Sequence, residues 1–404
     1  MTRARPAMLA ASLAALIAFP ARAPAWEATT THAGLAEQAA TASHLHARLR
    51  DGLGVPDGLF TQLTVPPADA PALFTVLRDL DPIEGYVPDA RGRLLALGWL
   101  AAGAVIADVP ASHAADHFFD PATGKGMQRA SGGLTGSLRD KLRDSASGRL
   151  PTNGVPAPDW VVSPENPFNL AGFQDQYLKA VRAVTPGERA RHVAAALLAA
   201  GAILHVLQDM GSPSHVRGDV AAHLDLVGND ASDLGSRFER IAAVAFGRLG
   251  VPAPSRVVNA TSLRAYFTNA EGTGLADVTA ARWFSAYTLP APVRIGNESR
   301  RTDLGEKLIA SLERPSPTVP TRLNLVAAQR EAGVEISDAS GVCLARYRVE
   351  RDVLSWFTDD ACALEQLGAL LPEAAAYGAG LLDWRFRGEL SASGAQDSGL
   401  TIAA

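Results

Sequence analysis

The residues of this chain best suited to chemistry lie between His205 and His215. The segment HVLQDMGSPSH places His205 and Asp209 four residues apart at the polar end of an apolar run, so a helix would direct both side chains to one side. Pro213 would end that helix and return His215 toward the same place. Buried imidazole and carboxylate groups are costly unless they are paired or bind a metal, and this set suits zinc. The alternative is a hydrogen-bonded core histidine beside an acidic helix end.

A second set of ligand-type residues follows another apolar segment. A helix expected over residues 94–107 would end beside Asp108, and the sequence HFFDP begins at His117. Asp108 and His117 could therefore converge at one helix end. Carboxylate and imidazole side chains are again the types that zinc prefers.

The beginning of the chain has the features of a secretory signal peptide. Arg3 and Arg5 form a basic start, residues 8–19 form an apolar core, and residues 23–25 (APA) fit a cleavage site. The apolar run is too short to span a membrane. Cleavage there would make Trp26 the new N-terminus, whose free amine and carbonyl oxygen can chelate a metal. We therefore expect a secreted or periplasmic protein.

Together with Trp26, His32 and Glu239, these segments resemble the zinc-dependent phospholipase C and single-strand nuclease superfamily. The resemblance runs from Trp26 to Glu239 and is most specific in the 205–215 segment and in HFFDP, which is closer to the bacterial phospholipase C branch. Members of this superfamily are mostly helical and begin, after processing, with a zinc-ligating tryptophan. Three zinc ions in a cleft hydrolyse phosphate esters.

The resemblance implies three zinc sites in this chain. Their ligands would be Asp108, His117, His205 and Asp209 at the first, His215 and Glu239 at the second, and Trp26, His32 and the bridging Asp209 at the third. A carboxylate shared by two metals draws them close enough to hold one phosphate together. Asp108 would also be the catalytic residue that orients or deprotonates the attacking water.

One position departs from the pattern of the superfamily. A histidine normally stands four residues before the glutamate, but this chain has Gly235 four residues before Glu239. Only two clear protein ligands then remain for the second zinc, below the usual three of a catalytic site. His223 could supply the missing ligand from a loop, as could an acidic residue, namely Asp219, Asp225, Asp230 or Asp233. If nothing replaces the histidine, the second site would be weak or empty.

The composition is that of a globular protein built mainly of helices. Of the 404 residues 47% are hydrophobic and only 6% are aromatic, with abundant alanine and leucine. We therefore expect an all-α fold, a multi-helix bundle of the superfamily's type with long irregular loops, and a small β element near residues 334–336. The expected helices span residues 27–51, 69–80, 90–107, 168–184, 187–211, 231–249, 275–286, 303–313, 345–357 and 361–384.

Four parts of the chain can be distinguished. They are a signal peptide (1–25), a zinc-dependent phosphoesterase-like helical domain (26–314), a C-terminal helical extension packed on it (315–390) and a tail (391–404). Cys343 and Cys362 lie in the extension and could form a disulfide in an exported protein or remain two buried thiols.

The expected function is that of a secreted zinc-dependent phosphoric ester hydrolase, most simply a phospholipase C-like enzyme with up to three Zn²⁺. Its partner would be a phospholipid or other phosphate ester, with transient membrane contact, and the enzyme would be a monomer. The formal charge of −5 gives no basic surface, so no stable nucleic-acid complex is expected. Two alternatives are a single-strand nuclease of the same superfamily and, because of Gly235, a secreted zinc-binding protein with weakened catalysis.

Overall fold

The computed structural model describes residues 27–80, 86–128, 153–224, 236–295 and 325–387, together with the backbone of residues 391–395 and 399–403. The expected signal peptide, Trp26, Gly235 and the helix expected over residues 303–313 lie outside the described residues.

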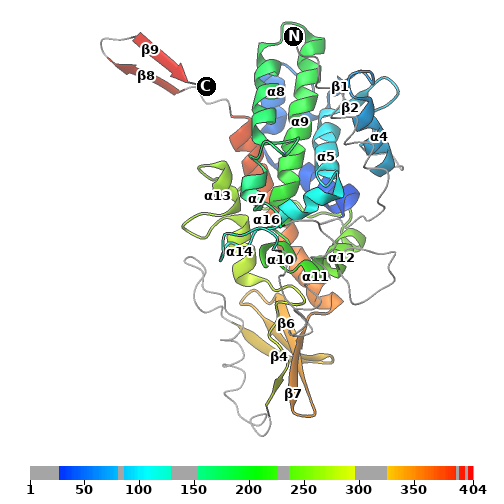
Figure 1. Ribbon diagram of the computed structural model, residues 1–404, viewed down its shortest axis with the longest axis vertical. Helices are drawn as coiled ribbons and strands as arrows, with labels where there is room; N and C mark the ends of the chain where they lie inside the picture. The colour runs from blue at the N-terminus through cyan, green and yellow to red at the C-terminus, as the bar shows by residue number, and fades with distance from the viewer. Residues whose placement is uncertain are drawn as a thin grey trace.

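Helices make up most of the described structure (Figure 1). Their bounds, in chain order, are η2 (Ala28–His32), α2 (Ala33–Ala42), α3 (Leu45–Ala47), η3 (Arg48–Gly52), η4 (Gly58–Phe60), α4 (Pro71–Leu80), α5 (Ala96–Ile106), η5 (Ala111–His117), α7 (Ala157–Trp160), α8 (Leu170–Arg182), α9 (Pro186–Asp209), α10 (Pro213–Val216), α11 (Val220–Leu224), α12 (Arg237–Ala245), α13 (Leu263–Phe267), α14 (Leu275–Arg282) and α16 (Asp360–Arg385).

The structure also contains antiparallel sheets, so the fold is mainly helical, as expected, but not purely all-α. The strands are β1 (Gln62–Thr64), β2 (Arg93–Leu95), β3 (Val293–Arg294), β4 (Val326–Arg330), β5 (Gly333–Ser337), β6 (Cys343–Glu350), β7 (Val353–Phe357), β8 (Ser391–Ala395) and β9 (Gly399–Ala403). Within the described residues, β3, β7, β6, β5 and β4 form a five-stranded sheet in that order, while β1–β2 and β8–β9 pair separately. The large sheet lies at one end of the helical bundle (Figure 1).

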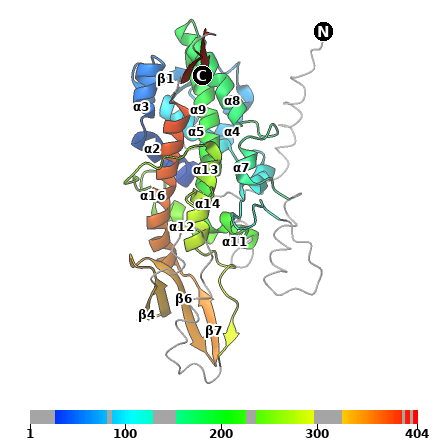
Figure 2. The same cartoon turned by 90° about the vertical axis from the view of Figure 1, so that its left-hand side faces the viewer.

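Helix α9 is the centre of the bundle. Thr185 and Glu188 form a capping box at its start and Pro186 occupies the first turn. The helix packs against α5, α8 and α16, and α16 in turn packs along α2 (Figure 2). By length and composition α9 could cross a membrane, but 78% of its most apolar window is buried within the protein. Such a helix is typical of a protein core.

Two glycines let α5 and α9 approach closely. A Cβ atom on Gly103 would lie 2.0 Å from the carbonyl oxygen of Leu198, and one on Gly201 would lie 1.9 Å from that of Leu100. Since real Cβ atoms do not approach backbone so closely, any side chain at either position would force the two helices apart. This contact brings the ends of α5 and α9 together, and both ends carry ligand-type residues.

The helix expected over residues 345–357 is instead the β6–β7 hairpin. In β7 the buried side chains alternate, with Leu354 and Trp356 on the inner face, which is the period of a strand. Arg351 and Asp352 form the two-residue turn with positive φ angles of 49° and 61°, the conformation that such hairpins need. The small β element expected near residues 334–336 is confirmed as β5.

The segment from 315 to 390 is therefore part sheet and part helix, not helical throughout. Its helix α16 runs from residue 360 to 385 with Pro372 inside it, and it packs into the core of the bundle. Residues 391–395 and 399–403 form the β8–β9 hairpin where a tail was expected.

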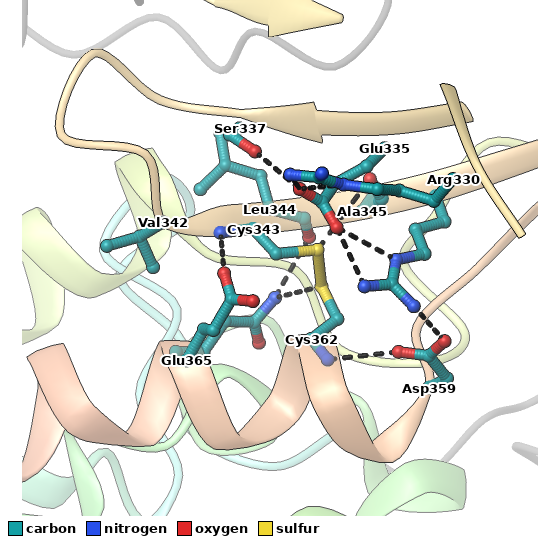
Figure 3. Close-up of a disulfide and its surroundings, with 12 residues drawn as sticks. Arg330, Glu335, Ser337, Val342, Cys343, Leu344, Ala345, Asp359, Cys362 and Glu365 are labelled. Carbon is teal, nitrogen blue, oxygen red and sulfur yellow. Dashed lines mark hydrogen bonds and ion pairs between the residues drawn. A yellow bond between two sulfur atoms is a disulfide. The ribbon is translucent and has the colours of Figure 1, made fainter. Parts of the chain in front are cut away.

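A disulfide joins the large sheet to α16 (Figure 3). Cys343 begins β6 and Cys362 lies in the first turn of α16, and both are fully buried. Beside it, Gln366 donates to the carbonyl of Leu344, and Glu365 accepts from the backbone of Cys343. Arg346 on β6 contacts Asp359, the residue that caps α16. The sheet is thus fixed to the bundle by covalent, polar and ionic contacts together.

Replacing both cysteines by alanine should lower the free energy of unfolding by about 3 kcal/mol, the chain-entropy contribution of a loop of this size. Urea denaturation measures this loss, and bound metal per chain should stay unchanged because neither cysteine contacts the histidine clusters described below. An unchanged unfolding midpoint would show that the disulfide contributes nothing to stability.

Candidate metal centre

Asp209, at the C-terminal end of α9, lies within a buried group of histidines and carboxylates. Its Oδ1 lies 3.3 Å from Nε2 of His32, and its Oδ2 lies 3.1 Å from Nδ1 of His117 and 3.4 Å from Nε2 of His205. Asp108 completes this central cluster, with Oδ1 3.2 Å from His117 Nδ1 and Oδ2 3.4 Å from His205 Nε2. Only Asp108 reaches solvent, with 15% of its side chain exposed.

Four separate segments bring the central cluster together. His32 ends η2, Asp108 follows the end of α5, His117 ends η5, and α9 supplies both His205 and Asp209. The four-residue spacing on α9 places the last two on one helix face, as the sequence predicted. The rings of His32 and His205 are stacked, with centroids 3.5 Å apart.

A second group, the Glu239 cluster, lies on the three helices that follow α9. His215 on α10 places Nε2 3.7 Å from Glu239 Oε1, and His223 on α11 places Nδ1 3.5 Å from Glu239 Oε2. The two imidazole rings are 4.6 Å apart and nearly perpendicular. All three side chains are buried, and Ser212 donates a hydrogen bond to Glu239 Oε1.

Hydrogen bonds on the outer side of the clusters fix the orientation of three imidazoles. Nδ1 of His205 donates to the carbonyl of Ala104 at 2.6 Å, and Nδ1 of His215 donates to the carbonyl of His117 at 3.0 Å. Nδ1 of His32 donates to the side-chain oxygen of Gln208 at 2.7 Å. In each neutral ring the proton therefore sits on Nδ1, and the lone pair of Nε2 points into the cluster, as in histidines that bind metal.

The inward-facing atoms of both clusters are buried and have no hydrogen-bond partner. They are Nε2 of His32, His205 and His215, both nitrogens of His117, Nδ1 of His223, Oε2 of Glu239 and both oxygens of Asp108 and Asp209. Buried polar atoms are rarely left unsatisfied, because each one costs about 1–3 kcal/mol. A metal ion bound between these atoms would satisfy their lone pairs.

Three groups in the described residues, two of which share His205, could hold a metal ion. They are His32 with His205 and Asp209, Asp108 with His117 and His205, and His215 with His223 and Glu239. In each group the ligand atoms lie within 4.8 Å of one another. The nitrogen and oxygen donors suit a divalent transition-metal ion.

The electrostatics of the central cluster favour ionised carboxylates. Burial opposes the charge on Asp108, but the charge of His205 and the contact with His117 outweigh it, so the pKa of Asp108 lies well below its usual range. Burial likewise opposes the charge on Asp209, yet the surrounding imidazoles, His215 first among them, lower its pKa as well. Both residues are therefore ready to bind a cation.

The imidazoles respond to burial and to carboxylate contacts in opposite ways. Burial disfavours the charged form of His117, but contacts with Asp108 and Asp209 outweigh burial and raise its pKa to about 10. Burial dominates at His215 and lowers its pKa to about 4. At His223 burial is outweighed by Glu239, and the pKa is raised.

Metal affinity should therefore fall with decreasing pH. In the metal-free chain His117, with a pKa of about 10, is protonated at pH 6 to 8, and a metal must displace that proton to use the lone pair. For one proton released, the dissociation constant should tighten about tenfold for each unit of rising pH below the pKa. Competition titrations with a zinc indicator at pH 6, 7 and 8 measure this slope. A dissociation constant that does not change with pH would contradict the assignment of His117 as a ligand.

The structure brings together all the predicted ligand residues that it describes. His223, one of several candidates for the missing ligand, contacts Glu239, whereas Asp219 points elsewhere and accepts hydrogen bonds from Ser285 Oγ and from the backbone of Tyr287. The remaining candidates Asp225, Asp230 and Asp233 lie outside the described residues, as does Trp26.

Two residues support the Glu239 cluster in ways that the sequence did not indicate. Phe118 stacks on His215 with centroids 4.3 Å apart and meets the ring of His223 edge-on at 5.3 Å. Asp219 accepts from the backbone of Ala222 and thereby begins α11, the helix that carries His223. The HFFDP motif contained Phe118 but gave no sign of its contacts, which come from segments about a hundred residues apart.

Comparison of this chain with protein-family models, with curated proteins and with solved structures returns no match.

Proposed function

We propose that this protein is a secreted zinc-dependent phosphoric ester hydrolase, most simply a phospholipase C-like enzyme acting on a phospholipid. The observation that carries the proposal is the position of Asp209, whose two carboxylate oxygens face different histidines. Oδ1 faces His32 and Oδ2 faces His117 and His205, all within 3.4 Å. A carboxylate placed in this way can bridge two metal ions, the arrangement that many phosphodiesterases use to hold one phosphate.

Zinc bound here would supply Lewis-acid chemistry, making water acidic near neutral pH and stabilising charge on phosphate oxygens. Asp108, His117, His205 and Asp209 would hold the first ion, His215, His223 and Glu239 the second, and His32 with Asp209 the third. The amine and carbonyl of Trp26 would complete the third set after removal of the signal peptide.

The residues of the chain itself would orient the reactants. Asp108 is the member of the central cluster whose side chain is partly exposed, although its two oxygens are buried, so a water molecule that enters from this side would meet its carboxylate first and would lose a proton to it. The outer hydrogen bonds of His205 and His215 hold their rings in place while the substrate binds. The bundle behind them excludes water from the fully buried side.

His223 is the observation that favours an active enzyme over a weakened zinc-binding protein. It gives the Glu239 cluster a third side-chain ligand despite Gly235, which meets the usual number for a catalytic zinc. The choice between phospholipid and single-stranded nucleic acid rests on the resemblance and on the acidic net charge of −5.

The proposal is tested by metal analysis and a substrate panel on the purified, processed protein. The panel contains phosphatidylcholine and phosphatidylethanolamine vesicles, single-stranded DNA and bis(4-nitrophenyl) phosphate. We expect bound zinc, release of a phosphorylated head group from vesicles, and loss of that activity on chelation. Preferential cleavage of DNA would favour the nuclease, and zinc without turnover of any substrate would favour the non-catalytic alternative.

A further inference from the structure

A groove of about 1130 Å³ is lined in part by residues 384–387 at the C-terminal end of α16, the end of this helix that lies away from the large sheet in Figure 1. Its walls come from α3 and η3, from α8 and from the last residues of α16, which lie beside α8 in Figure 1. None of its lining residues belongs to the groups that can hold a metal. The groove is thus a separate feature of the bundle.

The groove is lined by arginines. Arg48, Arg385 and Arg387 all contribute to it, and the carboxylate among its lining residues, Asp51, is paired with Arg50 through two contacts. Arg48 donates through Nη1 to the carbonyl of Arg387 at 3.0 Å, which fixes its side chain at the end of α16. The lining therefore carries an excess of positive charge.

Within the described residues, no carboxylate pairs with the guanidinium of Arg385. Its Nε and Nη2 are buried without a hydrogen-bond partner, and its charge lies 3.9 Å from the centre of the Trp384 ring. Burial lowers the pKa of Arg385 to about 10. Buried arginine is normally paired with a carboxylate or phosphate, so an anion in the groove would stabilise this side chain.

Aromatic rings form the other wall of the groove. Phe173 and Phe386 are buried, and Tyr177, partly exposed, stacks on Phe173 with centroids 5.9 Å apart and meets Phe386 nearly perpendicularly at 5.4 Å. Trp384 lines the same space. Rings packed in this way present a rigid apolar face that suits a planar ligand.

We propose that this groove binds a small aromatic anion, a planar ring carrying a carboxylate, sulfonate or phosphate. The anionic group would lie near Arg385 and Arg48, where guanidinium donors match its oxygens, and the ring would lie against Tyr177 and Trp384. The site is independent of the proposed hydrolase activity, because its residues are distinct from the metal ligands.

The test is isothermal titration of the purified protein, with its metals, using naphthalene-2-sulfonate as the probe. We expect one molecule of probe bound per chain. The affinities for 2-naphthol, which lacks the anionic group, and for ethanesulfonate, which lacks the aromatic ring, should each be at least about tenfold weaker. Arg385→Met should weaken the probe about tenfold or more, the effect of losing a charge-assisted contact. The matched control is Arg182→Met, an exposed arginine on α8 outside the groove, which should leave the affinity unchanged.

Tyr177→Leu provides a second variant if Arg385→Met does not fold, and it should also weaken the probe. Two results would overturn the proposal. One is no binding of millimolar probe by the wild-type protein, and the other is wild-type affinity for the probe in both the Arg385 and the Tyr177 variants. Loss of binding in Asp209→Asn but not in the groove variants would assign the probe to the metal centre and would overturn it as well.

Discussion

Asp209→Asn is expected to reduce phosphodiester hydrolysis by roughly a thousandfold, since metal stabilisation of the transition state is worth several kcal/mol and each 1.4 kcal/mol corresponds to a factor of ten. The substitution replaces one carboxylate oxygen by an amide group that cannot ligate in the same way. Because Oδ1 and Oδ2 face different histidines, two metal sites should be damaged at once. Mass spectrometry under native conditions and metal analysis would count the ions, and the substrate panel would give the rate.

The matched control for this variant is Asp277→Asn. Asp277 is also a buried carboxylate, but it accepts hydrogen bonds from Thr268 and from the backbone of Asn269, outside the metal groups. That variant should keep its full metal content whatever happens to its stability. An Asp209→Asn protein with unchanged metal stoichiometry would remove the bridging assignment.

His223→Gln is expected to empty the Glu239 cluster of its metal and to lower the rate about a hundredfold or more. Loss of residues that merely orient metal ligands already costs 10–100-fold in affinity or activity, and His223 would be a direct ligand. The metal count should fall by one, with the central cluster intact, because no atom of His223 belongs to that cluster. His192→Gln is the control. His192 is half-buried near the start of α9, and its side chain forms a hydrogen bond with Gln176 on α8, so this variant should keep the metal content and the rate of the wild type.

A compensating substitution makes the His223 experiment sharper. Gly235→His restores the histidine four residues before Glu239 that the resemblance leads one to expect, so in the His223→Gln background it should recover metal and activity. Full metal content in His223→Gln alone would instead assign the third ligand to another residue, such as an aspartate between residues 225 and 235.

Local sequence signals predicted the helices of the bundle well. The apolar run that ends at His205 predicted α9, and the four-residue spacing at its end predicted the shared face of His205 and Asp209. These features depend on neighbours within one or two turns, so sequence alone contains them. The β6–β7 hairpin was mistaken for a helix, because its strands are defined by pairing with each other and with β5, which local sequence does not contain.

The sequence by itself determined which side chains can bind metal and which of them share a helix, because residue type and helical period are local properties. Only the tertiary structure decided which of these side chains lie together in one cluster. Contact of α5 with α9 at Gly103 and Gly201 brings Asp108 to His205, and the packing of α10, α11 and α12 brings His223 to Glu239. Contacts between residues far apart in the chain follow from packing of whole elements, and no short stretch of sequence encodes them.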